Sequence, residues 1–155
     1  MDWSDGYELG RPDPLLLAEF NKASGMGKSV YANTEDAKEY FNRGATEFTQ
    51  HNYNQSISDL TKAIEIDPND SDAYCFRGLV YSTQGNYNQS ISDLTKAIEI
   101  NPNSEDAYGN RGLTYYRMKE YDKAWADTNK ALLLGASPFN LDYINDLKKA
   151  SGRDQ

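Results

Sequence analysis

The sequence predicts an all-α solenoid of three stacked helix-turn-helix units, with an N-terminal helix before them and a C-terminal capping helix after them. Two observations carry this prediction. Residues 52–66, NYNQSISDLTKAIEI, recur without a substitution at 86–100, and a diverged copy, EYDKAWADTNKALLL, occupies 120–134. The offset is 34 residues each time, which indicates repeated stacking of one supersecondary unit. Within each copy the apolar residues follow helical spacing rather than the alternation of a strand.

Each unit is expected to contain two helices separated by turns. The second helix carries an apolar stripe of Ile57, Leu60, Ala63 and Ile64, and the chain then reaches Pro68, which cannot continue it. The next helical run covers 71–84. Residues suited to N-capping, Asp36, Asp70 and Ser104, precede the three first helices. The units are therefore expected at 37–70, 71–104 and 105–138.

The flanking segments have different expected roles. Residues 1–12 form an irregular arm, 13–24 a short helix with the apolar face Leu16, Leu17, Phe20 and Ala23, and 25–36 a linker. A helix this short needs a surface to dock on. It either caps the open edge of the first unit or lies in the inner groove of its own chain or a neighbour's. Residues 139–150 are expected to cap the last unit, and 151–155 to fray.

The periodic residues resemble the tetratricopeptide repeat, whose period is also 34. They are the aromatics Tyr40, Tyr74 and Tyr108; the glycines Gly44, Gly78 and Gly112; the turn tyrosines Tyr53, Tyr87 and Tyr121; the small residues Ser56, Ser90 and Ala124; the alanines Ala63, Ala97 and Ala131; and the prolines Pro68 and Pro102. The third unit departs from the pattern, with Ala136 in the place of the proline. The resemblance implies a right-handed solenoid whose first helices line a concave, peptide-binding face.

The resemblance also implies which side chains read a ligand, namely the first-helix residues that the repeat does not use for packing. They are Lys38, Phe41, Asn42, Ala45 and Phe48; Asp72, Cys75, Phe76, Leu79 and Ser82; and Asp106, Asn110, Leu113, Tyr116 and Arg117. Phe41, Phe76, Leu79, Leu113 and Tyr116 form an expected apolar stripe with Asp72 and Asp106 at its margin. An exposed stripe of this kind predicts an apolar or mildly basic peptide or helix as partner.

Co-chaperone members of the family bind acidic heat-shock-protein tails through a clamp of Lys, Asn and Arg side chains. The matching positions in this chain are Phe41, Ala45, Phe76, Asp106 and Asn110. None carries the expected side chain, and Asp106 has the opposite charge. The sequence therefore predicts that such a tail is not the partner.

A second periodic feature is charged. Arg43, Arg77 and Arg111 are each followed sixteen residues later by Asp59, Asp93 and Asp127. We interpret each pair as an ion pair that ties the two helices of a unit together, because a ligand-binding arginine does not require an aspartate that recurs at a constant spacing from it. A ligand-binding arginine is the alternative.

Composition limits the function. The net charge of −8 and pI of about 4.6 disfavour nucleic acid. The single cysteine excludes an internal disulfide and is compatible with a reducing compartment, so we expect a cytoplasmic location. No apolar run is long enough to cross a membrane. With one histidine, His51, and no nucleotide loop around Gly27, we predict no metal, cofactor or catalysis. The leading hypothesis is a scaffold or adaptor module, and the alternative is a self-associating unit.

Overall fold

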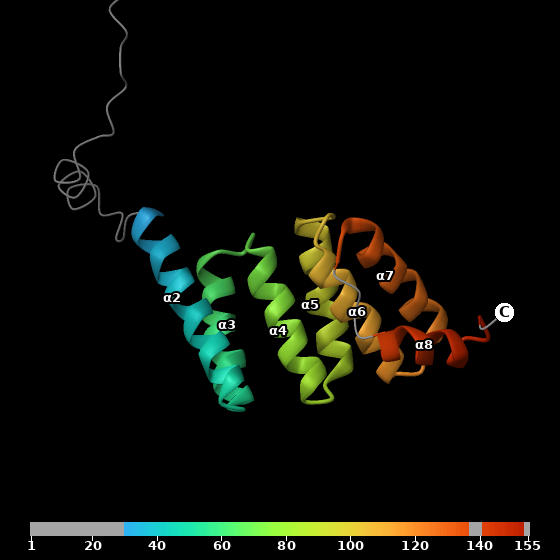
Figure 1. Cartoon of the computed structure of the whole chain (residues 1–155). Coiled ribbons are helices and arrows are strands. Elements are labelled where there is room, and N and C mark those ends of the chain that lie inside the picture. The colour runs from blue at the N-terminus through green and yellow to red at the C-terminus, as the bar shows by residue number, and fades with distance from the viewer. Residues whose placement is uncertain (1–29, 137–140, 154–155) are drawn as a thin grey trace, which may run out of the picture.

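The computed structural model describes residues 30–136 and 141–153, and all the regular secondary structure in these ranges is helical. The helices are α2 (Val30–Thr49), α3 (Tyr53–Ile66), α4 (Ser71–Thr83), α5 (Tyr87–Ile100), α6 (Glu105–Arg117), α7 (Tyr121–Leu134) and α8 (Leu141–Ala150). The pairs α2–α3, α4–α5 and α6–α7 pack most extensively and stand in a row, with α8 at the far end (Figure 1). The predicted all-α fold of three paired units plus a capping helix is confirmed.

The two helices of a unit touch where the periodic glycine lies. A Cβ atom on Gly78 would come within 2.7 Å of Leu94 Cγ and 3.2 Å of the Ser90 carbonyl oxygen. A carbon atom cannot approach another this closely without a shift of the neighbour. Gly44 and Gly112 are equally crowded by the second helices of their own units. The period of glycines therefore sets how closely the helices of each pair approach.

Helix boundaries follow the predicted caps in units two and three but not in unit one. Asp70 Oδ1 accepts hydrogen bonds from the N–H groups of Asp72 and Ala73, and Ser104 Oγ accepts one from Ala107. In contrast, α2 already begins at Val30, so residues 30–36 of the expected linker are helical and Asp36 lies inside the helix. The cause is local: position 34, where the later units have a proline, is a threonine.

The remaining predictions for the termini lie outside the described residues. These are the N-terminal arm, the expected helix 13–24 and residues 25–29 of the expected linker; residues 137–140, where the third unit is expected to give way to the capping helix, also lie outside the described residues. The chain does leave α7 through Gly135, which has a φ of 105°. Inside the units, the turn between the two helices places His51, Gly85 and Lys119 at φ values of 64°, 82° and 62°, in equivalent positions.

The predicted arginine–aspartate ties are present in all three units. Arg77 Nε donates to Asp93 Oδ2 at 2.7 Å, and its Nη2 donates to Asp93 Oδ1 at 2.9 Å. Arg43 with Asp59 and Arg111 with Asp127 repeat this bidentate geometry. The hydrogen bonds from Arg43 hold the pKa of the Asp59 carboxyl below its usual range. The interpretation as an internal tie is confirmed.

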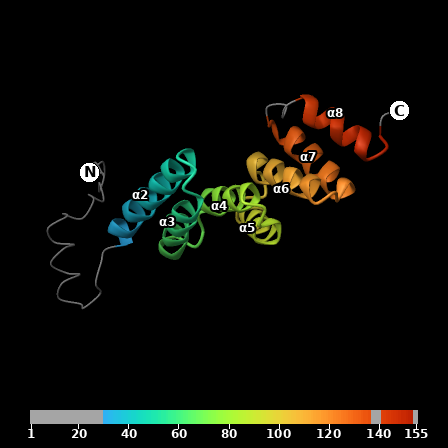
Figure 2. The same ribbon diagram turned by 90° about the horizontal axis from the view of Figure 1, so that it is seen from below.

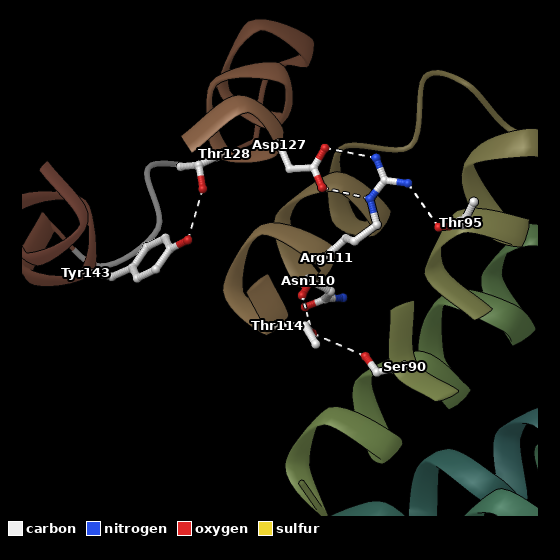
Figure 3. A network of polar contacts seen from close by, with 8 residues as sticks. All are labelled: Ser90, Thr95, Asn110, Arg111, Thr114, Asp127, Thr128 and Tyr143. Carbon is white, nitrogen blue, oxygen red and sulfur yellow. Dashed lines mark hydrogen bonds and ion pairs between the residues drawn. The ribbon is translucent and has the colours of Figure 1, made fainter. Parts of the chain in front are cut away.

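The same arginines also join neighbouring units. Arg77 Nη1 donates to Thr61 Oγ1 of α3 at 2.9 Å. In the next unit, Figure 3 shows the equivalent bond, in which Arg111 Nη1 donates to Thr95 Oγ1 of α5 at 3.1 Å. One guanidinium thus holds three helices of two units. Within the described residues no helix pair precedes Arg43, and its side chain is 45% exposed, against 16% for Arg77 and 18% for Arg111.

Helix α8 closes the C-terminal end of the array. Leu147 is fully buried, and the Tyr143 hydroxyl lies 2.9 Å from Thr128 Oγ1 of α7 (Figure 3). The Tyr143 ring also meets the Tyr116 ring of α6 edge-on, with 5.2 Å between centroids. Helix α8 therefore occupies the position of the next unit's first helix and shields the last apolar surface from water.

The first helices form the inner side of the array. Helix α4 contacts both α2 and α6, whereas second helices of neighbouring units make no comparable contact within the described residues. Because α2, α4 and α6 lie closer together than their partners, the row bends towards them. Figure 2 shows the same units from below, each rotated relative to the last.

Ser56 and Ser90 occupy the same place in two identical copies but differ in hydrogen bonding. Ser90 Oγ lies 3.2 Å from Thr114 Oγ1 of the next unit. The residue equivalent to Thr114 in unit two is Val80, which offers no polar atom. Ser56 Oγ is accordingly buried without a hydrogen-bond partner among the described residues.

Replacing Arg77 by alanine should lower the free energy of unfolding by about 3 kcal/mol, because Asp93 stays buried without its partner. Urea denaturation followed by circular dichroism measures this change. Arg43→Ala is the matched control: it leaves the buried Asp59 without its partner in the same way but breaks no bond between units, so it should cost less than Arg77→Ala, which also loses the bond to Thr61. Equal losses in the two variants would contradict the role of Arg77 in holding two units together.

Ser56→Ala should raise the free energy of unfolding by about 1 kcal/mol, because it removes a buried hydroxyl with no partner. Ser90→Ala, at the equivalent position, should not stabilise the chain, because it leaves Thr114 without the Ser90 hydroxyl. The measurement is again urea denaturation of both variants. A stabilisation of the same size in both would show that the hydrogen bond between Ser90 and Thr114 has no effect.

Candidate functional site

Three phenylalanines gather on the inner side of units one and two. The rings of Phe41 in α2 and Phe76 in α4 meet edge-on with 5.7 Å between centroids, and Phe48 meets Phe76 at 5.5 Å. All three side chains are only partly buried. Aromatic side chains that remain partly open to water can contribute large apolar contact area to a partner. We call these three residues the aromatic cluster.

A pocket of about 330 Å³ opens beside the aromatic cluster. Four of its lining residues, Lys38, Phe41, Asn42 and Asp72, are predicted ligand readers; the others are Thr34, Ala37, Asp67 and Asp70. Sequence reasoning missed Asp67 as a lining residue and assigned Asp70 only to the N-cap of the following helix. Their position in the sequence could have indicated this role, because the turn that ends one unit lies beside the first helix of the following unit.

The junction of units two and three is polar where that of units one and two is aromatic. Thr114 Oγ1 donates to Ser82 Oγ at 3.0 Å, and Arg117 Nη1 donates to the Ser82 carbonyl oxygen at 3.0 Å. Ser82 stands in the repeat position of Phe48, and it is buried. The two halves of the inner surface therefore offer different chemistry.

The predicted ligand readers divide by exposure. Lys38, Asn42, Asp72, Asp106 and Arg117 are exposed, and Phe41, Ala45, Phe48, Phe76, Leu79, Asn110, Leu113 and Tyr116 are half-buried. Part of the Tyr116 ring is covered by Tyr143 of α8. Cys75 and Ser82 are the exceptions in this set, because both are buried.

Cys75 packs inside the protein and does not face a ligand. It belongs to a core cluster with Leu94, Ala97 and Ala107, and Asn110 Nδ2 lies 3.6 Å from its sulfur atom. Burial raises the pKa of the Cys75 thiol to about 11, and the nearby carboxylates of Asp106 and Asp72 act in the same direction. The equivalent positions hold Phe41 in unit one and Gly109 in unit three, but Cys75 packs against Ala107 and Asn110 of the next unit, so it leaves the candidate surface.

The described residues contain no group of three or more His, Cys, Asp or Glu side chains arranged to hold a metal ion. His51 lies in its turn with Nδ1 3.1 Å from the Tyr53 hydroxyl. Within the same residues, no helix combines the length and apolar character of a membrane span. The candidate site is therefore a surface of aromatic, carboxylate and amide groups.

Stacked helix pairs with a partly apolar inner face define an α-solenoid that binds other polypeptides. Models of the tetratricopeptide repeat match residues 37–70, 60–92 and 105–134, and a further TPR repeat model matches 78–119. The chain belongs to the tetratricopeptide repeat family, whose domains are non-catalytic protein-binding modules. No curated protein matches the chain.

Several solved structures have a similar fold. The first TPR of Spaghetti (RPAP3) bound to the HSP90 peptide SRMEEVD is 25% identical, with a TM-score of 0.70 over 77% of this chain and 94% of that chain. The TPR2B domain of yeast Sti1, in complex with pHsp70, is 23% identical with a TM-score of 0.69, covering 78% and 99%. MamA is 31% identical with a TM-score of 0.61, covering 66% and 59%.

The Cys75 thiol should not react with dithiobis(nitrobenzoate) at pH 8 in the folded chain. At that pH a group with a pKa of about 11 is almost entirely thiol, and the thiolate is the attacking species. In denaturant, where burial is lost, the same chain should release a full equivalent of thionitrobenzoate, measured by absorbance. Rapid reaction of the folded chain would place Cys75 on the surface instead.

Proposed function

We propose that the inner surface of α2, α4 and α6 binds an apolar, mildly basic peptide or helix of a partner protein, in a scaffold or adaptor role. The aromatic cluster is the observation that carries this proposal. Phe41, Phe48 and Phe76 come from two units, so only the stacked array brings them together. Partly exposed aromatic groups are the usual anchors of a binding surface.

The charged groups around the aromatic cluster favour a partner of positive charge. The pocket beside Phe41 is lined by Asp67, Asp70 and Asp72 and by one cation, Lys38. Asp106 extends the acidic margin on α6 and is exposed. Complementary charge raises the rate and specificity of association. A partner with Lys or Arg beside apolar residues matches this margin better than an acidic one.

For binding of an acidic tail, the similarity to solved structures favours such a ligand, whereas the side chains of this chain disfavour it. The Spaghetti domain is similar in fold, and its peptide SRMEEVD is acidic. In this chain the positions of the family's clamp carry Phe41, Ala45, Phe76, Asp106 and Asn110. Asn110 is directed to the sulfur of Cys75, and Phe76 is engaged in the aromatic cluster. We therefore propose that this chain does not bind such a tail.

Calorimetric titration with three peptides tests the proposal. Two are synthetic helical peptides with the same leucines, one carrying lysines and the other glutamates, and the third is SRMEEVD. The lysine peptide should bind at least about tenfold more tightly than either acidic peptide, equivalent to about 1.4 kcal/mol. Phe76→Ala should remove most of this binding, because Phe76 touches both other phenylalanines.

Leu133→Ala is the matched control for the loss of an apolar side chain. Leu133 is 84% exposed on α7, away from the first helices, so binding should not change. Double substitution of Asp72 and Asp106 by asparagine should reduce the preference for lysine over glutamate. Tighter binding of SRMEEVD than of the lysine peptide would overturn both the proposed partner chemistry and the exclusion of acidic tails.

A further inference from the structure

The open N-terminal edge of the array exposes polar side chains at positions that are buried at the internal junctions. Ala73 of α4 packs on α3, and Ala107 of α6 packs on α5, and both are fully buried. The same position in α2 is Glu39, which is exposed. Thr46 is likewise exposed, whereas its equivalent in unit three, Thr114, is fully buried. The face of α2 that a preceding unit would cover is therefore already suited to water.

Cations complete this polar edge. The Arg43 guanidinium lies 4.7 Å and the Lys62 ammonium 5.3 Å from the centre of the Tyr40 ring. The same arginine–tyrosine contact recurs at 5.7 Å in units two and three, where Arg77 and Arg111 also bond to the preceding unit. At the edge, the Arg43 side chain is instead 45% exposed. Terminal units of solenoids carry such a polar outer face because no neighbour stacks on them. An apolar helix docked here would bury Glu39 and Arg43 without new partners, which is costly.

Residues 13–24 nevertheless carry an apolar face that needs a surface. The sequence places Leu16, Leu17, Phe20 and Ala23 on one side of this predicted helix. Because the N-terminal edge is polar, it does not suit this apolar face. The aromatic cluster and its pocket are a partly exposed apolar surface near α2 that does suit it. We infer that residues 13–24 of the same chain occupy this part of the inner surface. The inference uses the surface of the proposed function but does not require an external partner.

The length of chain before α2 fits this arrangement. Helix α2 starts at Val30, which leaves residues 25–29, with two glycines, to reverse direction after residue 24. At about 1.5 Å per residue, Phe41 lies about 16 Å along α2 from Val30, and a twelve-residue helix is about 18 Å long. An antiparallel helix that ends near Val30 therefore reaches Phe41 with its first turn.

Two individual lysines of the segment suit the carboxylates of the pocket. The pocket between α2 and the turn before α4 is lined by Asp67, Asp70 and Asp72. The N-terminal segment brings Lys22 near the end of the predicted helix and Lys28 just before α2. In the antiparallel arrangement both lysines lie at the level of the pocket. Asp13 and Glu19 offset these two lysines, so the segment as a whole is not basic. It shares with the proposed external partner an apolar face, and it would compete with that partner for the aromatic cluster.

Charge substitutions in the full chain test the inference. Leu16→Glu together with Phe20→Glu places two carboxylates on the apolar face of the segment. Ala18→Glu together with Asn21→Glu is the matched control, because it adds the same charge on the opposite face. The readouts are amide chemical shifts from ¹H–¹⁵N spectra and molecular mass from light scattering.

If the segment lies on the aromatic cluster, the first double variant shifts the signals of Phe41 and Phe76, and the control does not. The Arg43 Nε–H and Lys62 amide signals at the edge stay in place, at every concentration. Shifts at Arg43 and Lys62 instead would show a capping helix and overturn the inference. Unchanged spectra would overturn it as well, and a mass that falls on dilution together with the shifts would assign the segment to a second copy.

Titration with the lysine peptide separates this inference from the proposed function. The double variant Leu16→Glu with Phe20→Glu should bind the peptide about tenfold more tightly than the unmodified chain, because competition is removed. Shifts without peptide binding would support self-occupation and overturn the proposed function. Equal peptide binding with unchanged spectra would support the proposed function and overturn self-occupation.

Discussion

The array depends on one repeated interaction, the guanidinium that joins two helices of its own unit to the unit before. Arg77 holds Asp93 with two hydrogen bonds and Thr61 with a third, and Arg111 holds Asp127 and Thr95 in the same way. A planar group with five donors can satisfy several acceptors in a fixed geometry. The tie therefore sets both the pairing within a unit and the stacking between units, and the inner surface follows from that stacking.

A repeated frame does not make the units equivalent. Identical letters at 52–66 and 86–100 meet different neighbours, so Ser90 finds Thr114 whereas Ser56 faces the position of Val80. Along the inner side, equivalent positions hold Phe48, Ser82 and Tyr116, which give an aromatic junction, a polar junction and a contact with α8. The repeat keeps the arrangement of the helices constant. The differences between units in side-chain chemistry come from positions that depart from the repeat.

Membership in the tetratricopeptide repeat family establishes a protein-binding module, and the side chains decide what it binds. The fold is shared with domains solved with heat-shock-protein peptides. The inner surface of this chain, however, combines aromatic rings with a carboxylate margin, and its first unit ends in a polar edge. We propose that a surface of this kind favours apolar, basic segments of a partner and that its aromatic part also takes up the apolar segment before α2.

The sequence by itself determined the number of helices in the units, their pairing, the arginine–aspartate ties and the capping helix, because each depends on a period of 34 or on local spacing. Other features depend on which units meet. The bonds from Arg77 to Thr61 and from Arg111 to Thr95, the burial of Cys75 and the pocket with Asp67 and Asp70 join residues of neighbouring units. No local pattern reports such contacts, so only the tertiary structure decided them. Helix α2 is intermediate, since the threonine at position 34 already removed the proline stop, but the helix's extension to Val30 became visible only in the structure.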